Sequence, residues 1–223
     1  MTYLTSLTID YFVEFYGWQQ DNKDIRIFME SCHGYDKETA KDINNNAAAY
    51  TRSLLNAIAI LHSKDIVHRD IKPENMLTCK NSKNRFKLTD FEYSTQQQIA
   101  NDFMGTYEVA APEHLHNAFK YNEKQFYSLK ESDMFSVGAT LGLAFDIMDE
   151  ETYGAYKDIT MSRYIRRFRC FNGFQSKWTD GTVDLTIKAQ LVLLVQKLTS
   201  CIPKDRMTAV QALEFFKNNF HVY

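Results

Sequence analysis

Residues 67 to 77 read Val-His-Arg-Asp-Ile-Lys-Pro-Glu-Asn-Met-Leu, and this stretch decides the fold. It places an imidazole, a guanidinium, a carboxylate, an ammonium and an amide on the eight residues from His68 to Asn75. Pro73 blocks a helix through the stretch, and apolar residues flank it on both sides. A rigid polar loop between buried segments is where fixed polar groups carry out chemistry. We therefore expect the functional site to be built around this loop.

The order His-Arg-Asp-x-Lys-Pro-x-Asn resembles the catalytic loop of the eukaryotic protein kinases. Phosphoryl transfer needs a carboxylate to orient a hydroxyl, a cation near the phosphate oxygens, and oxygen ligands for magnesium. The resemblance implies that Asp70 orients the hydroxyl and that Lys72 neutralises the phosphate. It also implies that Asn75 is one ligand of Mg²⁺.

A second metal-binding carboxylate is expected near Asn75 in space. Asp90 ends the β-like run Lys87-Leu88-Thr89 and is followed by Phe91 and Glu92. An acid at the end of a strand is by itself an ordinary cap. In the kinase resemblance it is the metal-binding Asp, and Glu92 replaces the glycine that the family has after Asp-Phe. A glycine there allows backbone conformations closed to other residues, so the effect of Glu92 stays open.

Residues 105 to 113, Gly-Thr-Tyr-Glu-Val-Ala-Ala-Pro-Glu, resemble the end of a kinase activation segment. The resemblance implies that Thr106 supports Asp70 and Lys72, as in kinases that phosphorylate serine or threonine. It also pairs Glu113 with Arg206 in a buried salt bridge. Loss of one partner of such a pair should cost about 3–5 kcal/mol.

Three further residues are given structural or regulatory roles by the resemblance. His68 packs beneath the catalytic loop, and Arg69 faces the activation segment, where it would receive a phosphate. Asp133 holds the backbone of the catalytic loop, although its position also fits an N-cap. The pair Ser132-Asp133 predicts the start of an apolar helix from Met134 to about Met148.

The first third of the chain predicts a β-hairpin from residues 11–18 and 24–29, with a polar turn at 19–22. This hairpin resembles the last two strands of the kinase N-lobe. The match makes Met29 the gatekeeper and residues 30 to 32, from Glu30 to Cys32, the hinge that binds adenine of ATP. Leu77 would form the floor of the adenine pocket.

Apolar periodicity predicts the remaining elements. A short helix is expected within residues 35–46 and a long one over residues 47–64. Further helices are expected over residues 185–200 and 209–220, whereas residues 91–119 are expected to be irregular and 114–131 to be a linker. Residues 156–181 have no clear assignment.

The composition fits a globular protein with a core, with 44% hydrophobic residues and a net charge of −2. This charge predicts no binding to nucleic acid, and no apolar stretch is long enough to span a membrane. The cysteines are far apart and lack a Cys-x-x-Cys pair, so we expect neither a disulfide nor a zinc site. A cytoplasmic, reducing location is the expectation.

The resulting fold is α+β and mainly α-helical: a kinase-like C-lobe over residues 34–223, with residues 1–33 as a remnant of the N-lobe. Gly17 is the one glycine before residue 34, so the phosphate-binding glycine loop of the family is missing. No Val-Ala-x-Lys precedes the hairpin, and Lys23 lies in its turn. A two-stranded hairpin is marginal alone, so we expect it to lie on the larger lobe with an open outer edge.

The resemblance supports two functional hypotheses. In the first, the chain is an enzyme that transfers phosphate from ATP, with Mg²⁺, to serine or threonine of a protein substrate. In the second, it is a pseudokinase or C-lobe mimic that binds a kinase or its substrate. The missing glycine loop favours the second hypothesis, whereas the presence of Asp70, Asn75 and Asp90 together favours the first.

Overall fold

The computed structural model describes residues 9–21, 23–80, 84–119, 126–145, 147 and 185–220. Within these ranges the chain forms a helical body with small antiparallel sheets, which confirms the predicted α+β, mainly helical fold. The main helices and strands, in chain order, are β1 (Phe15–Gln20), β2 (Ile25–Met29), α1 (Lys37–Asn45), α2 (Ala47–Ser63), β3 (Met76–Thr78), β4 (Phe86–Leu88), β5 (Ile99–Ala100), α3 (Pro112–Phe119), β6 (Tyr127–Ser128), α4 (Leu129–Ala144), α7 (Leu185–Leu198) and α8 (Ala209–Asn219). Short 3-10 helices are η2 (Ile9–Tyr11), η3 (Pro73–Asn75), η4 (Tyr107–Val109) and η6 (Pro203–Asp205).

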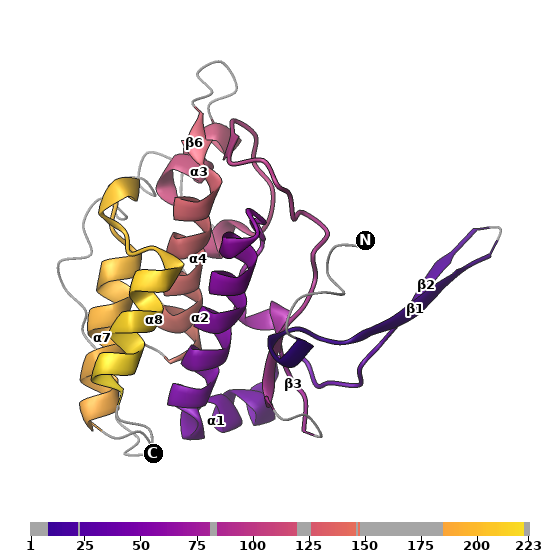
Figure 1. The fold of residues 1–223 in the computed structure, drawn as a ribbon, viewed down its shortest axis with the longest axis horizontal. Helices are drawn as coiled ribbons and strands as arrows, with labels where there is room; N and C mark the ends of the chain where they lie inside the picture. Colours follow the sequence, from indigo (N-terminus) through magenta and orange to yellow (C-terminus); the bar gives the residue numbers. More distant parts are fainter. Residues whose placement is uncertain are drawn as a thin grey trace.

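Helix α2 forms the centre of the body, with α4 and α8 packed beside it (Figure 1). Its apolar side chains recur every three or four residues, and Tyr50, Leu54, Ile58 and Leu61 are fully buried. The rings of Tyr50 and Phe86 meet edge-on with centroids 5.3 Å apart, which joins α2 to strand β4. The helices predicted over residues 47–64, 185–200 and 209–220 are thus present with almost the predicted bounds.

Helix α4 begins earlier than the sequence predicts. Its N-cap is Ser128, so the predicted cap at Ser132 and Asp133 is wrong, and both residues lie inside the helix. The helix is buried on almost every side, and Ser132 and Asp133 are among its buried residues. Their side chains therefore lie against neighbouring segments and do not cap the helix. Gly138 faces α7, where a Cβ atom would lie 2.7 Å from the side chain of Thr199. The absence of a side chain therefore lets α4 and α7 approach closely.

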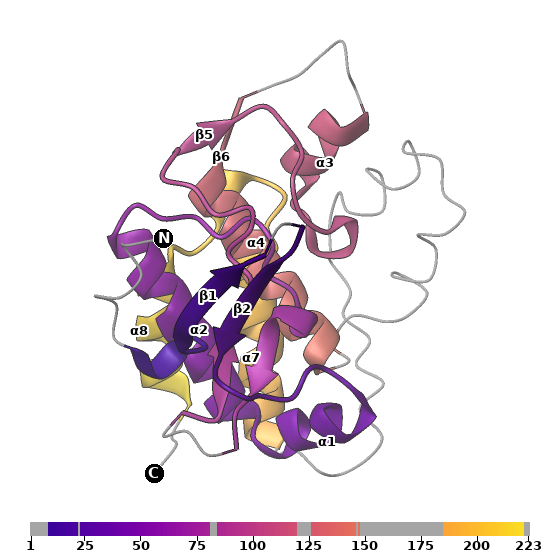
Figure 2. The same cartoon turned by 90° about the vertical axis from the view of Figure 1, so that its right-hand side faces the viewer.

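The segment from residue 91 to 131 is more regular than predicted. It contains β5, η4, α3, β6 and the start of α4, so the expected irregular stretch and linker are wrong in these parts. The pair β5–β6 and helix α3 lie at one end of the body, and α1 lies at the other end (Figures 1 and 2). The elements are short, and short elements carry little periodic signal.

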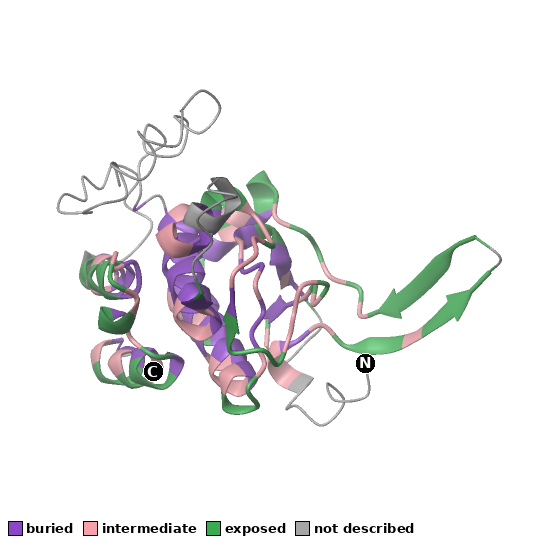
Figure 3. Ribbon diagram, turned by 90° about the horizontal axis from the view of Figure 1, so that it is seen from above, coloured by how far each residue is buried: buried purple, intermediate pink, exposed green. Residues whose placement is uncertain are grey.

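The predicted β-hairpin exists, but it does not lie on the larger lobe. Strands β1 and β2 project away from the body, and nearly all of their residues are exposed (Figure 3). Cross-strand pairing puts Trp18 beside Ile27 and Phe15 beside Met29 on one face. These side chains remain 43–58% exposed. The hairpin therefore has an apolar face that the described residues do not cover.

The base of the hairpin is anchored on strands β3 and β4. Val13 donates its backbone N–H to the carbonyl of Leu88 at 3.1 Å on one side. On the other side, Cys32 and Cys79 form a disulfide, so the prediction of unpaired cysteines is wrong. The two cysteines are 47 residues apart in the sequence, and they become neighbours because His33, directly after the hinge, pairs with Thr78 of β3.

None of the helices in the described ranges is both long and apolar enough to cross a membrane.

Candidate active site

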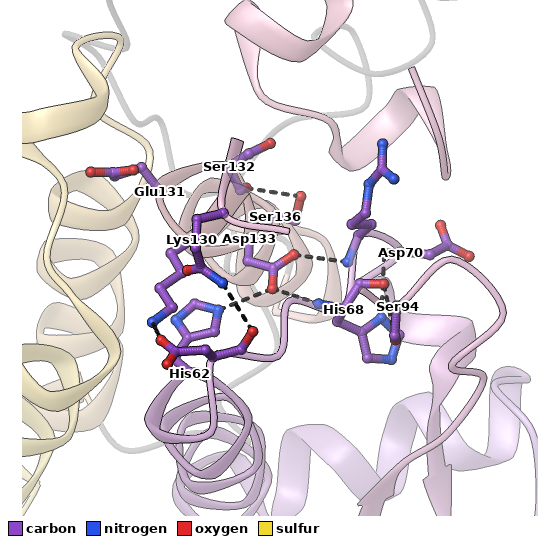
Figure 4. Close-up of polar contacts among 12 residues, drawn as sticks. His62, His68, Asp70, Ser94, Lys130, Glu131, Ser132, Asp133 and Ser136 are labelled. Carbon is purple, nitrogen blue, oxygen red and sulfur yellow. Dashed lines mark hydrogen bonds and ion pairs between the residues drawn. The ribbon is translucent and has the colours of Figure 1, made fainter. Parts of the chain in front are cut away.

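The catalytic loop, residues 68–75, is fixed from below by the carboxylate of Asp133. One oxygen of Asp133 accepts the backbone N–H of His68 at 2.8 Å, and the other accepts that of Arg69 at 2.9 Å. His62, at the end of α2, contacts the same carboxylate at 3.0 Å (Figure 4). Burial disfavours the ionised form, but the hydrogen bonds from His62 and His68 outweigh it and lower the pKa of Asp133. The carboxylate thus stays ionised and orders the loop.

The ring of His68 lies beneath the loop and is fully buried. Nε2 lies 3.1 Å from the carbonyl of Thr89 and donates to it, while Nδ1 accepts the backbone N–H of Asp70 at 3.3 Å. Burial lowers the pKa of His68, so the ring stays neutral with this tautomer. The ring also contacts Phe91, at a centroid distance of 5.0 Å. His68 therefore joins the catalytic loop to the segment that carries Asp90.

The side chains of Asp70, Lys72 and Thr106 form one hydrogen-bonded cluster, in which Asp70 is only 4% exposed. Thr106 donates its hydroxyl to Oδ1 of Asp70 at 2.6 Å, and Lys72 lies 2.8 Å from Oδ2. Lys72 also donates to the hydroxyl oxygen of Thr106 at 2.9 Å. Desolvation opposes the charge on Lys72, but Asp70 outweighs it and raises the pKa of Lys72. The cluster is therefore a charged carboxylate–ammonium pair with a bridging hydroxyl.

Asn75 and Asp90 lie at the same end of the β3–β4 hairpin. The N–H of Thr89 donates to the carbonyl of Asn75 at 3.0 Å, which places the two segments side by side. The amide nitrogen of Asn75 donates to the backbone and to the carboxylate of Asp70 at 2.8 and 3.2 Å. The side-chain oxygen of Asn75 can therefore act as a metal ligand. Asp90 is exposed, so its carboxylate is accessible to an ion. Carboxylate and amide oxygens are the donors that Mg²⁺ prefers, so this pair fits the ion.

Asp90 has a left-handed backbone, with φ of 64°. Such strain in a non-glycine residue is found mainly at functional sites. Glu92, which replaces the family's glycine, has no positive φ and donates its N–H weakly to Asp90 at 3.4 Å. Asp90 therefore has the left-handed backbone conformation, whereas Glu92 has a backbone conformation that any residue can adopt.

The activation segment, residues 90–113, crosses the catalytic loop at Gly105. This glycine has φ of 97°, and a Cβ atom there would lie 2.2 Å from the carbonyl oxygen of Arg69. The side chain of Arg69 reaches Asp102 in the same segment, with Nη2 2.7 Å from Oδ1. Arg69, predicted to receive a phosphate, is thus already paired with an acid of the chain.

His114 supports the activation segment from the other side. Its Nε2 accepts the backbone N–H of Met104 at 3.0 Å, and its ring contacts Phe103 and Tyr127. Burial, with a smaller contribution from Arg69, lowers the pKa of His114 to about 4. The ring therefore stays neutral and keeps its acceptor nitrogen at neutral pH.

Glu113, at the end of the segment, and Arg206, after η6, form a bidentate ion pair. The two nitrogen–oxygen distances are 2.6 and 2.8 Å. Arg206 is 4% exposed and also donates to the carbonyls of Ser200 and Glu131. The guanidinium lies over the ring of Phe135, 5.0 Å from its centroid. The resemblance predicted this pair. The additional contacts of the guanidinium with the two carbonyls and the Phe135 ring were not predicted.

The expected nucleotide-binding residues lie on both sides of the hairpin base. Met29 ends β2 and is 44% exposed, and Leu77 lies in β3. Glu30 forms an ion pair with Lys87 at 2.7 Å. Among the described residues, the backbone N–H and carbonyl of Cys32 have no hydrogen-bonding partner. That leaves one donor and one acceptor of the hinge available to a ligand.

Three residues of this site were not assigned to it from the sequence: His62, Asp102 and His114. The contact of His62 with Asp133 depends on the packing of α2 against α4, which no local sequence pattern reveals. The segment that carries Asp102 has no Lys or Arg. This lack of a local cation was the one sign in the sequence that Asp102 pairs with an arginine from elsewhere. No local pattern marks His114, because its partner Met104 lies on another segment.

Comparison with known proteins decides the family. The model of the protein kinase domain matches residues 1–216. The chain belongs to the protein kinase family. The match confirms the resemblance that the catalytic loop and the activation segment predicted.

Curated relatives of this kinase-family chain include plant protein kinases. It is 28% identical to calcium-dependent protein kinase 29 of Arabidopsis thaliana over 217 residues, covering 91% of the chain and 36% of the relative. It is 26% identical to a CDPK-related protein kinase of Daucus carota, covering 90% and 32%. It is 31% identical to CDPK-related kinase 5 of Arabidopsis thaliana, covering 89% and 32%. The chain thus spans about a third of the length of these relatives.

Proposed function

We propose that the chain transfers the terminal phosphoryl group of ATP to serine or threonine of a protein substrate. The observation that carries the proposal is the cluster in which Thr106 and Lys72 both bind the carboxylate of Asp70. An acceptor hydroxyl beside this carboxylate would be oriented by a group that is itself held by two hydrogen-bond donors. The ammonium of Lys72 lies where it would neutralise the transferred phosphate.

The nucleotide would be held between the hinge and the β3–β4 hairpin. The free N–H and carbonyl of Cys32 are suited to adenine, and Leu77 offers an apolar surface below it. Asn75 and Asp90 would hold Mg²⁺, which neutralises the charge of the phosphate oxygens when bound. Met29 would lie at the back of this pocket, and Glu30 would belong to the hinge beside it.

The division of the chain follows the same proposal. Residues 1–33 would be the part that corresponds to the N-lobe, and residues 34–223 the C-lobe. The N-lobe part contributes the hinge, while all catalytic groups named above come from the C-lobe.

The prediction of a cytoplasmic location used the absence of paired cysteines, and the disulfide removes that support.

A phosphate-transfer assay with radiolabelled ATP, Mg²⁺ and a mixed protein substrate tests the proposal. We expect labelling by the wild type and its loss in Asp70→Asn, because the amide cannot orient the hydroxyl as a carboxylate does. Asp24→Asn is the matched control, since Asp24 is an exposed acid near the hairpin turn. Labelled phosphoserine or phosphothreonine in the wild type and control alone would support the proposal.

Binding of the nucleotide is tested separately by thermal unfolding. A ligand at 100 times its Kd stabilises the folded state by about 2.7 kcal/mol, and Asp90→Asn should reduce this shift with Mg-ATP.

Equal labelling by wild type and Asp70→Asn would contradict the catalytic role of Asp70. Absence of both labelling and a thermal shift would overturn the proposal and favour the binding-module hypothesis.

A further inference from the structure

The hinge is attached to the C-lobe by an arrangement that the kinase resemblance does not predict. His33 and Thr78 exchange two backbone hydrogen bonds of 2.9 Å each, so the residue directly after the hinge forms an isolated antiparallel bridge with β3. Cys32 and Cys79 are the next facing residues of this pairing, with Cα atoms 4.4 Å apart. Facing residues that do not exchange hydrogen bonds come closest in antiparallel pairs, which is why a disulfide fits here.

The disulfide lies within the proposed nucleotide site. Cys32 carries the free backbone N–H of the hinge, and Cys79 follows Leu77 by two residues on the strand expected to face adenine. The bond thus joins the donor side of the pocket directly to its apolar floor. Within the described residues the hairpin β1–β2 projects from the body and is attached at its base, so this bond also limits movement of the hairpin (Figure 1).

The surroundings of the two sulfur atoms slow the opening of the disulfide. A carboxylate oxygen of Glu30 and both sulfur atoms lie within 4.8 Å of one another. A negative charge at this distance disfavours the thiolate that must leave when a reductant attacks the disulfide. Lys87, which pairs with Glu30, reduces this effect.

We propose that the Cys32–Cys79 disulfide is a redox-controlled clamp that fixes the hinge for nucleotide binding. This inference rests on the proposed function, since it assigns the N–H of Cys32 to the nucleotide. With the disulfide formed, the hinge keeps one position relative to Leu77. With the disulfide opened, two hydrogen bonds and the Glu30–Lys87 pair remain, and the hinge samples more positions.

The chemistry of opening is thiol–disulfide exchange with a dithiol reductant. Its thiolate attacks the sulfur of Cys32, since Cys32 is partly exposed whereas Cys79 is 1% exposed. The Cys32–Cys79 bond breaks, Cys79 leaves as a thiolate, and a mixed disulfide forms on Cys32. The second thiol of the reductant then attacks that mixed disulfide and releases Cys32. Two electrons pass to the chain, both cysteines take up protons, and the dithiol is oxidised to its own disulfide.

The state of the clamp is measured first without nucleotide. Hydrogen exchange at the amides of His33 and Thr78 is compared in the oxidised chain and after treatment with a dithiol, with thiol alkylation and mass spectrometry to count free cysteines. We expect alkylation to leave Cys32 and Cys79 unmodified in the oxidised chain and to modify both after reduction, with faster exchange at both amides after reduction. Unchanged exchange after complete reduction would overturn the clamp.

Nucleotide affinity is measured next by titration with Mg-ATP. We expect reduction to weaken binding about tenfold, which corresponds to the loss of one hydrogen bond to the ligand. Cys32→Ser/Cys79→Ser should bind as the reduced chain does and ignore the dithiol. Cys201→Ser is the matched control and should keep the full redox response, because Cys201 is not part of the Cys32–Cys79 disulfide.

The two proposals fail in different ways. Equal affinity in both redox states, with faster exchange after reduction, would overturn control of the nucleotide site by the clamp. Absence of Mg-ATP binding in every state would contradict the proposed function and, with it, the link to nucleotide. The exchange at His33 and Thr78 would then still decide whether the disulfide fixes the hinge.

Discussion

At the scale of single residues, the approach of the activation segment to the catalytic loop depends on Gly105. Its φ of 97° is unfavourable for other residues, and a Cβ atom would lie 2.2 Å from the backbone oxygen of Arg69. We predict that Gly105→Ala lowers the free energy of unfolding by about 1–3 kcal/mol and separates Thr106 from Asp70. Urea denaturation measures the first effect, and loss of phosphate transfer reports the second.

Gly34→Ala is the matched control for this substitution. Gly34 has no positive φ, and a Cβ atom there would have no neighbour within 4 Å. Its stability should change by less than about 0.5 kcal/mol, as for an ordinary surface substitution. Equal effects of the two substitutions would contradict the steric role of Gly105.

The buried ring of His114 makes stability depend on pH. In the unfolded chain the imidazole takes up a proton below about pH 6.5, whereas in the folded chain it does so below about pH 4. Between these values the unfolded state binds more protons, so the free energy of unfolding decreases as the pH falls. We predict a loss of about 3 kcal/mol from His114 over this range.

Denaturation at several pH values compares the wild type with His114→Gln, whose side chain does not titrate. The slope should decrease by up to about 1.4 kcal/mol per pH unit in the variant. Some pH dependence should remain, because burial also lowers the pKa of His68. The same slope in both proteins would show that His114 is not held neutral by burial.

At the scale of elements, the β1–β2 hairpin forms although nearly all of its residues are exposed to solvent. Trp18 is 58% exposed, whereas Phe12, at the base of the hairpin, is 7% exposed and packs against Phe91. We predict that Trp18→Thr costs less than about 1 kcal/mol, the range of one cross-strand pair. Phe12→Ala should cost about 3–5 kcal/mol, because it opens a cavity in the core.

Urea denaturation measures both variants, and sedimentation measures self-association at the same concentrations. We expect Trp18→Thr to reduce self-association, since an exposed apolar face promotes contacts between chains. If Trp18→Thr destabilised the chain as much as Phe12→Ala, the apolar face would have to be covered in solution.

The sequence predicts those elements whose pattern is local and long. Helix α2 and the catalytic loop were predicted because their apolar period and their fixed motif are each visible within twenty residues. Helix α4 was predicted to start too late, because Asp133 looks like a cap in sequence and serves His68 in the structure. The disulfide was missed since Cys32 and Cys79 become neighbours only through strand pairing.

At the scale of the whole molecule, the site depends on segments that converge from distant parts of the chain. Asp133 from α4 and His62 from α2 hold the catalytic loop, whereas Thr106 and Asp102 bring the activation segment to it. The contacts of Asp133 and His62 join the catalytic loop to the buried helical body, and those of Thr106 and Asp102 join the activation segment to that loop. The body thus keeps the charged cluster around Asp70 in place even though the hairpin stands apart.

The ion pair of Glu113 and Arg206 provides a test of this convergence, because the guanidinium also binds the carbonyls of Ser200 and Glu131. We predict that Arg206→Met costs about 3–5 kcal/mol, since it leaves the carboxylate of Glu113 without its partner. Arg85→Met is the matched control, because Arg85 is 44% exposed in its pair with Asp42, and it should cost less than about 1 kcal/mol.

A double-mutant cycle with Glu113→Gln separates the pair from the other contacts of the arginine. Since Glu113→Gln removes the charge that Arg206→Met leaves unpaired, the double variant should be more stable than the sum of the single losses implies. Guanidinium denaturation of the four proteins measures the coupling. Strict additivity would show that Arg206 stabilises the chain through the Ser200 and Glu131 carbonyls and Phe135, and that the contact with Glu113 contributes nothing of its own.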